Sequence, residues 1–218
     1  MMSAVVEALP TQTSTIRRNS IQALTEIFEP HCQIAIAKRR PVAAIDGYLS
    51  TVANRLGEGF RVSLKAGESL PLHLLPASPG REDFAADIAF LVGIYNDLLG
   101  CPAIGLRLEV LNCAMCPRFH VDHTGIRLLC TYRGPGTEWL EDRAADRSKL
   151  GPVSAGICDE DSGIILSPTG IHHVEPYAIA LLKGSRWQGN AGRGVVHRSP
   201  AVSVDEAPRV MLALDALW

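Results

Sequence analysis

Five side chains able to bind a metal ion fall within eleven consecutive positions of this chain. They are Cys113, Cys116, His120, Asp122 and His123. His120 and Asp122 are two residues apart, so on an extended strand both side chains point to the same face. One His and one carboxylate on a shared face supply two members of the two-His, one-carboxylate triad that suits non-haem Fe(II). We therefore expect a metal site that takes its third ligand from elsewhere in the chain, and His197 is the best candidate.

The same stretch supports a second hypothesis, a zinc site formed by Cys113, Cys116, His120 and His123. Thiolates favour zinc over Fe(II), and two Cys with two His would complete a tetrahedral shell. The four residues are more tightly spaced than in most zinc fingers, where the pairs come from separate elements. On a strand through His120 and Asp122, His123 also points away from them. Zinc remains the alternative to Fe(II), beside a reading in which these are structural His and Cys residues without a metal.

An arginine follows His197 after about a dozen residues. The order His120-x-Asp122, then His197, then Arg209 resembles the 2-oxoglutarate-dependent Fe(II) oxygenases. The resemblance implies that His120, Asp122 and His197 hold iron inside a double-stranded β-helix and that Arg209 binds the far carboxylate of 2-oxoglutarate. Three ligands on one face of an octahedral ion leave the opposite face for a bidentate 2-oxo acid and dioxygen, and a guanidinium suits the remaining carboxylate. The alternative is a non-catalytic zinc-binding protein, which needs no cation in the pocket.

Longer strings resemble a proteobacterial family catalogued as a domain of unknown function. They occupy residues 116–122, 127–140, 146–151 and 196–200, and the resemblance covers the chain from about Gln33 onward. It implies a link to zinc-responsive genes and metallochaperone GTPases, and so a role in metal homeostasis, but it supplies no reaction.

Arg127 and Arg198 lie close in sequence to the candidate ligands. Either could bind an anionic substrate, although solvated or salt-bridged positions are the default for such residues. The sequence by itself leaves both readings open.

Composition favours one globular domain and excludes some partners. The chain has 218 residues, 47% of them hydrophobic, and a net charge of −2, so it has no electrostatic reason to bind nucleic acid or an anionic membrane. It shows neither a secretory signal at its start nor an apolar run long enough to span a membrane. We expect a cytoplasmic protein whose six cysteines are reduced thiols or ligands.

The hydrophobic pattern changes period along the chain. We expect a mobile arm at residues 1–19 and a single domain at 20–218, helical at about 20–100 and β-rich at about 101–218. Apolar residues at three- and four-residue spacing predict a helix over 81–99, whereas alternation over 106–110 and 126–132 predicts strands. The polar, glycine-bearing stretch 141–163 is expected to be a lid-like insertion. The predicted fold is mainly β with flanking helices (α+β), around a double-stranded β-helix of the cupin or jelly-roll type.

Overall fold

The computed structural model describes residues 14–203 and 208–218. The expected arm therefore lies partly outside the described residues, and residues 14–18 form a strand. The strands are β1 (Ser14–Arg18), β2 (Cys32–Ala37), β3 (Gly59–Lys65), β4 (Ala103–Leu111), β5 (Ile126–Arg133), β6 (Glu138–Leu140), β7 (Ile171–His173), β8 (Ile179–Lys183), β9 (Val196–Arg198) and β10 (Arg209–Leu217). The α-helices are α1 (Ala43–Val52), α2 (Arg81–Leu99) and α3 (Asp159–Ser162), and 3-10 turns include Ile21–Phe28 and Ala53–Leu56.

Two sheets build the β core. The larger has the order β1-β2-β8-β5-β10-β4-β3 and the smaller the order β7-β6-β9, to which His120 adds an antiparallel bridge with His197. From β4 onward the chain alternates between the two sheets. The large sheet takes β4, β5, β8 and β10. The small sheet takes the segments between them, which are His120, then β6 and β7, then β9. In the large sheet each of the strands β8, β5, β10 and β4 runs antiparallel to the strand beside it in this order. This alternation is the topology of a double-stranded β-helix and confirms the predicted fold class.

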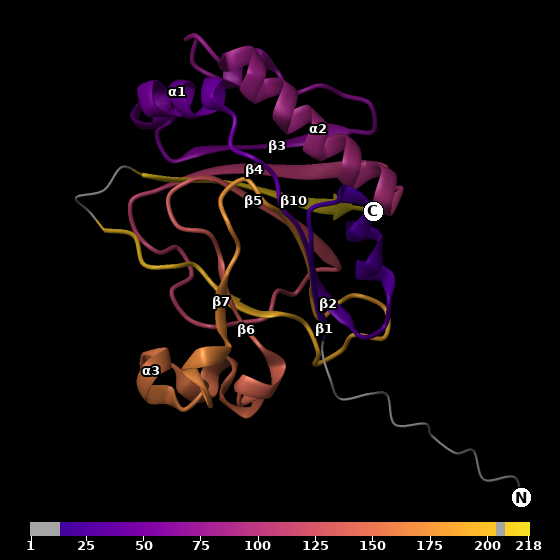
Figure 1. The fold of residues 1–218 in the computed structure, drawn as a ribbon, viewed down its shortest axis with the longest axis vertical. Coiled ribbons are helices and arrows are strands. Elements are labelled where there is room, and N and C mark those ends of the chain that lie inside the picture. Colours follow the sequence, from indigo (N-terminus) through magenta and orange to yellow (C-terminus); the bar gives the residue numbers. More distant parts are fainter. Residues whose placement is uncertain (1–13, 204–207) are drawn as a thin grey trace, which may run out of the picture.

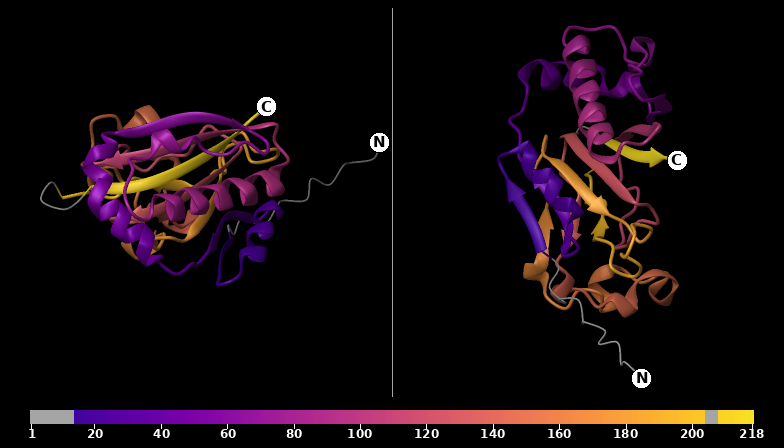
Figure 2. Two further views of the ribbon diagram at one scale, coloured as in Figure 1. Left: turned by 90° about the horizontal axis from the view of Figure 1, so that it is seen from above. Right: turned by 90° about the vertical axis from the view of Figure 1, so that its right-hand side faces the viewer.

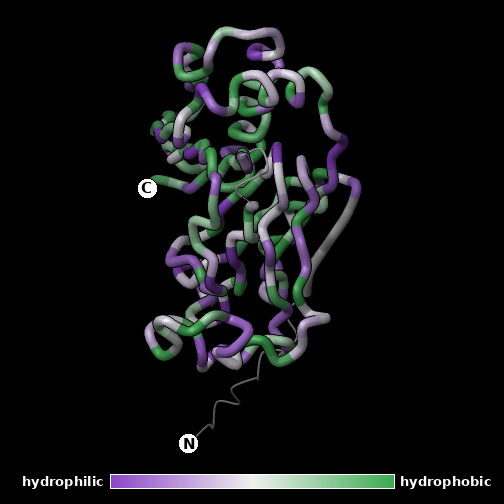
Figure 3. The backbone as a smooth tube through the Cα atoms, turned by 90° about the vertical axis from the view of Figure 1, so that its left-hand side faces the viewer, coloured by the Kyte–Doolittle hydropathy of each residue, from purple (hydrophilic) through white to green (hydrophobic). Residues whose placement is uncertain are grey.

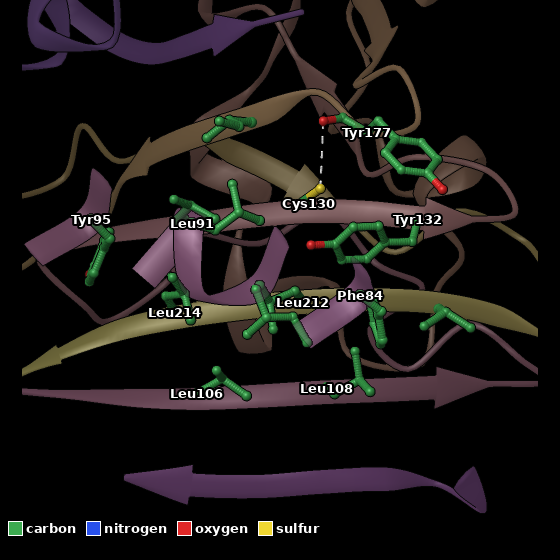
Figure 4. Packing of buried hydrophobic residues seen from close by; sticks show 14 of the residues in the cluster. Phe84, Leu91, Tyr95, Leu106, Leu108, Cys130, Tyr132, Tyr177, Leu212 and Leu214 are labelled. Carbon is green, nitrogen blue, oxygen red and sulfur yellow. Dashed lines mark hydrogen bonds between the residues drawn. The ribbon is translucent and has the colours of Figure 1, made fainter. Parts of the chain in front are cut away.

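Helices cover the outer face of the large sheet (Figures 1 and 2). Helix α2 buries Phe84, Ile88, Leu91 and Tyr95, which recur at three- and four-residue spacing and so form one apolar stripe. Figure 4 shows this stripe packed on apolar side chains of β4, β5 and β10. The helix ends at Gly100, whose φ of 62° is a left-handed conformation that glycine adopts without strain. The predicted helix over 81–99 is confirmed.

The two faces of β5 have different neighbours. Leu128, Cys130 and Tyr132 face the helices and join the main apolar cluster. Leu129 faces the small sheet and packs in a second cluster with Trp139 of β6 and residues of β10. Because side chains alternate along a strand, Arg127 and Thr131 share the face of Leu129. Strand β5 thus separates an apolar core from an interior that also holds polar groups.

The N-terminal half contains more strand than the sequence analysis expected. Strand β3 was not predicted, although Phe60, Val62 and Leu64 alternate with more polar residues. It pairs with β4 at the edge of the large sheet. Within the stretch expected to be helical, residues 43–56 form α1 followed by the 3-10 turn Ala53–Leu56.

Hydrophobic and hydrophilic stretches are interleaved through the body of the molecule (Figure 3). Among the described residues, no helix has the length and the apolar character that crossing a membrane requires.

The stretch between β6 and β7 is an insertion of 3-10 turns and α3, which lies at the opposite end of the molecule from α1 and α2 (Figure 1). It is ordered and packs on Phe119 through its own small apolar cluster, which includes Ala144 and Ile164. A lid function for it stays a prediction.

Candidate metal centre

A two-way backbone bridge holds His120 against His197. The N–H of each residue donates to the carbonyl of the other at 2.9 Å, which makes them an antiparallel pair. Their imidazole rings lie on the same side with centroids 4.5 Å apart. The predicted convergence of these two residues, which are far apart in sequence, is therefore present in the fold.

Both imidazoles are fixed in one tautomer by backbone carbonyls. Nδ1 of His120 lies 2.9 Å from the carbonyl oxygen of Arg118, and Nδ1 of His197 lies 3.0 Å from that of Val195. A carbonyl only accepts, so in the neutral ring Nδ1 carries the hydrogen and Nε2 keeps its lone pair. This is the arrangement that prepares a histidine to bind a metal through Nε2.

Asp122 completes the triad just beyond the bridge. Its Oδ1 lies 3.7 Å from Nε2 of His120 and its Oδ2 lies 3.4 Å from Nε2 of His197. One ligand atom from each of the three residues lies within 4.8 Å of the others, and this is the one such group of three or more among the described His, Cys, Asp and Glu residues. Two imidazole nitrogens and one carboxylate oxygen form a donor set that fits Fe(II).

A glycine allows the loop of Asp122 to pack closely. A Cβ at Gly184 would lie 2.4 Å from the carbonyl oxygen of Thr124 and 2.8 Å from that of Asp122. The N–H of Ser185 donates to the Asp122 carbonyl at 2.9 Å and secures the same loop. The end of β8 therefore determines where the carboxylate lies.

The charges of the triad suit cation binding. Burial alone would raise the pKa of Asp122, but its close contact with His197 and the positive charge of Arg127 leave that pKa well below its usual range. Burial, together with the neighbouring His197, lowers the pKa of His120. At neutral pH the site therefore presents an ionised carboxylate beside a neutral imidazole of His120.

The insertion anchors the segment that precedes His120. Oδ2 of Asp159, in α3, accepts the N–H of Phe119 at 2.7 Å and a bond from Arg198 at 3.0 Å. Arg198 also pairs with Glu138 at 2.6 Å and Glu160 at 3.0 Å. The default reading of Arg198 as a salt-bridged residue is confirmed, and sequence reasoning did not identify Asp159.

Arg209 enters the interior from the first residue of β10. Its side chain is 1% exposed, and burial lowers its pKa to about 10. Within residues 14–203 and 208–218 its guanidinium contacts neutral groups: the carbonyl of Pro135 at 2.7 Å, the hydroxyls of Thr131 and Thr137 at 3.2 and 3.1 Å, and the hydroxyl of Ser199 at 3.4 Å. Ser199 lies two residues after His197, so Arg209 and the triad belong to the same space between the sheets.

The hydroxyls around Arg209 were missed by sequence reasoning. Thr131 and Thr137 accept from the guanidinium through Oγ1. The Thr137 hydroxyl donates to the sulfur of Met211 at 3.9 Å, whereas the Thr131 hydroxyl keeps a hydrogen that it can donate to a bound anion. A β-strand threonine is so common that its type alone carries no signal.

Cys113, Cys116 and His123 are placed apart from this arrangement. Both cysteines are exposed, and Nδ1 of His123 lies 3.1 Å from the hydroxyl of Ser185. None of the three belongs to a group of three or more potential ligands in the described part of the chain. The structure therefore assembles the His-Asp-His triad and does not assemble the alternative cysteine-containing set.

The sequence of the chain matches one known protein family. The family described as "Protein of unknown function (DUF1826)" matches residues 18–215. No curated protein matches the chain at a significant level.

Solved structures similar to this chain include oxygenases, and their sequence identity to it is low. A dioxygenase for auxin oxidation from rice is 16% identical, with 94% of this chain and 83% of that chain covered and a TM-score of 0.48. The corresponding Arabidopsis thaliana enzyme, solved with 2-oxoglutarate, is 13% identical over 93% and 91% of the two chains, with a TM-score of 0.47. A Pseudomonas putida prolyl-4-hydroxylase is 10% identical over 90% and 92%, with a TM-score of 0.46. At these values the likeness carries no argument about activity, so fold and site rest on the topology and geometry described above.

Proposed function

We propose that this chain, which belongs to the family described as a protein of unknown function (DUF1826), is a metal-dependent oxygenase of the Fe(II)/2-oxoglutarate type. His120, Asp122 and His197 would hold the metal, and Arg209 would bind the far carboxylate of 2-oxoglutarate. The iron and the 2-oxo acid would supply the oxidative chemistry, while the protein binds and orients the reactants.

The buried guanidinium of Arg209 is the observation that carries the proposal. A buried cation without a carboxylate partner costs free energy, so such groups are rare unless a ligand completes them. In the described residues Arg209 has only neutral partners. A carboxylate would accept a charge-assisted hydrogen bond from Nη1 of this guanidinium, whose second N–H has no acceptor among the described residues. A protein that only stores or transfers zinc has no use for such a cation in its interior.

The interior face of β5 and β10 also suits an extended dicarboxylate. Apolar side chains of Leu129, Met211 and Ala213 lie on this face, as Thr131 does. They would contact the methylene groups of the co-substrate and exclude water from the metal. The hydroxyl of Thr131 would donate to the bound carboxylate.

The test is a spectroscopic titration. Untagged protein is stripped of metal, loaded with Fe(II) without oxygen, and titrated with 2-oxoglutarate while the visible metal-to-ligand charge-transfer band is followed. We expect a saturable band with the wild type, loss of the band in His197→Ala, and a much weaker titration in Arg209→Met with iron still bound. Arg143→Met, which changes an arginine whose side chain is 82% exposed, is the matched control and should behave as the wild type.

Zinc binding is the contrary outcome. The oxygenase assignment is lost if no band forms and the purified protein holds stoichiometric zinc that survives His197→Ala but disappears in Cys116→Ala. A band that is unchanged in Arg209→Met would leave the metal site standing and remove the assigned role of Arg209.

A further inference from the structure

Asp122 is held by an arginine that is itself held by a second carboxylate. Nη1 of Arg127 donates to Oδ2 of Asp122 at 2.6 Å. Nε and Nη2 of the same guanidinium donate to the two oxygens of Asp215 at 2.8 and 3.0 Å. Asp215 stands directly opposite Arg127 in the pairing of β10 with β5. The guanidinium therefore has one edge on Asp215 and its remaining nitrogen on the metal-binding carboxylate.

Asp215 is in turn fixed from the next strand. Nη2 of Arg107, on β4, donates to Oδ2 of Asp215 at 3.2 Å. Nη1 of Arg107 lies 3.7 Å from Glu109, which pairs with Arg61 of β3 at 3.3 Å. Alternating charges thus run from Asp122 across four strands to the edge of the sheet. Arg127 cannot turn away from Asp122 without breaking this chain.

The contact from Arg127 survives metal binding, unlike the contacts from the histidines. Once an ion is bound, Nε2 of His120 and Nε2 of His197 face the ion, and their present contacts with the carboxylate cease to orient it. Arg127 then remains as the described side chain that donates a hydrogen bond to Asp122. Arg127 lies on the large sheet and its hydrogen bond engages Oδ2 of Asp122. This favours metal binding through one carboxylate oxygen.

We propose that Arg127, clamped by Asp215, is a positioning residue that presents Asp122 to the metal as a ligand with one available oxygen. The inference rests on the metal centre of the proposed function and extends it to residues that touch neither the metal nor the co-substrate. One-oxygen binding by Asp122 leaves three positions of an octahedral ion open. The anionic-substrate reading of Arg127 is thereby replaced, because its nitrogens are engaged by two carboxylates.

A purely electrostatic role predicts the opposite effect on metal affinity. If the positive charge of Arg127 only repelled the cation, its removal would strengthen metal binding. If Arg127 positions the ligand, its removal weakens metal binding by about ten-fold or more, as is common for partners of metal ligands. The direction of the change therefore separates the two roles.

The experiment measures Co(II) affinity of the metal-free protein by calorimetry, without 2-oxoglutarate and without turnover. We expect Arg127→Met to weaken Co(II) binding at least ten-fold and Arg127→Lys to weaken it less. Asp215→Asn should weaken it in the wild-type background but add nothing in the Arg127→Met background, because Asp215 acts through Arg127. Arg143→Met, which changes an exposed arginine outside the charge chain, is the control and should leave the affinity unchanged.

Unchanged or tighter Co(II) binding by folded Arg127→Met protein overturns the proposal, as does an additive effect of Asp215→Asn in the double variant. Near-ultraviolet circular dichroism verifies the fold of each variant, and if Arg127→Met does not fold, Arg127→Lys and Asp215→Asn decide the outcome. Failure of the proposed function has a different signature: wild-type protein that binds no Co(II), or binds it equally well after His197→Ala, removes the metal centre itself.

Discussion

Arg127 and Arg209 stand at opposite ends of the pairing between β5 and β10, yet their surroundings are opposite. Arg127 contacts two carboxylates, and although burial alone would lower its pKa, its hydrogen bonds to Asp215 and the charge of Asp122 raise it. Arg209 is more deeply buried, contacts hydroxyls and a carbonyl among the described residues, and has its pKa lowered to about 10 by burial. One guanidinium is neutralised by the fold, whereas the other retains a charge that the described residues leave unpaired.

This difference assigns different tasks to the same side chain. A guanidinium whose charge is neutralised by two carboxylates attracts a further anion only weakly, so its task is to shape the site. A guanidinium held by neutral groups keeps its charge for an anion that arrives from solution. The buried, unpaired charge of Arg209 therefore destabilises the fold, whereas the ion pairs of Arg127 stabilise it. This is the pattern expected of a binding site beside a structural network.

The largest expected effect is that the two substitutions weaken the binding of different ligands. Arg209→Met should weaken 2-oxoglutarate binding to the metal-loaded protein about 100-fold, since a desolvated charge-assisted pair is lost, and should leave Co(II) affinity unchanged. Arg127→Met, measured at saturating metal, should change 2-oxoglutarate affinity only a few-fold. Calorimetry measures the affinity of each variant for Co(II) and for 2-oxoglutarate and so checks this difference. Equal losses of both ligands in the two variants would erase the distinction between the arginines.

The two substitutions should also move stability in opposite directions. Arg127→Met leaves Asp122 and Asp215 without their shared partner and should lower the free energy of unfolding of the metal-free protein by about 2 kcal/mol. Arg209→Met replaces a buried cation by an apolar chain of similar length and should raise it by about 1 kcal/mol. Urea unfolding followed by circular dichroism gives both values. A strongly destabilised Arg209→Met protein would indicate that this arginine is structurally neutralised after all.

The smallest expected effect is a pH dependence at Asp122. Its pKa is below the usual carboxyl range in the folded protein, so between that value and about pH 4 the unfolded chain binds a proton that the folded chain does not. The stability that Asp122 contributes is therefore complete above about pH 4 and is lost as the pH falls further. The difference in unfolding free energy between wild type and Asp122→Asn, measured without metal, should shrink by on the order of 1 kcal/mol from pH 5 to pH 3. A constant difference would mean that neither His197 nor Arg127 stabilises the ionised carboxylate.

Local patterns in the sequence predicted much of the fold. The apolar stripe of α2 and the alternation in β4 and β5 are short-range signals, and the structure confirms these elements. Strand β3 shows a similar alternation and was overlooked beside the helical stretches around it. Strand β1 was missed because its pairing with β2, rather than its own pattern, determines that it is a strand.

The candidate ligands were also predictable, for a partly different reason than expected. His120 and Asp122 were expected to share the face of one strand, but the strand-like pairing is a single bridge at His120. Asp122 reaches the triad from the turn that follows, where Gly184 permits close packing. The His-x-Asp spacing thus identified the two ligands. The backbone conformation that brings them together depends on contacts with β9 and with Gly184 at the end of β8.

The residue types and their order determined which side chains could bind a metal and a carboxylate, because ligand chemistry belongs to each side chain and the His-x-Asp spacing is local. Only the tertiary structure decided which of the nearby charges are free. Strand register places Asp215 opposite Arg127 and leaves Arg209 among hydroxyls, and the residues that it joins are 88 and 78 positions apart in the chain. Whether a buried arginine is a structural group or a binding group depends on those distant neighbours, since burial makes an unpaired charge costly and a paired one unavailable.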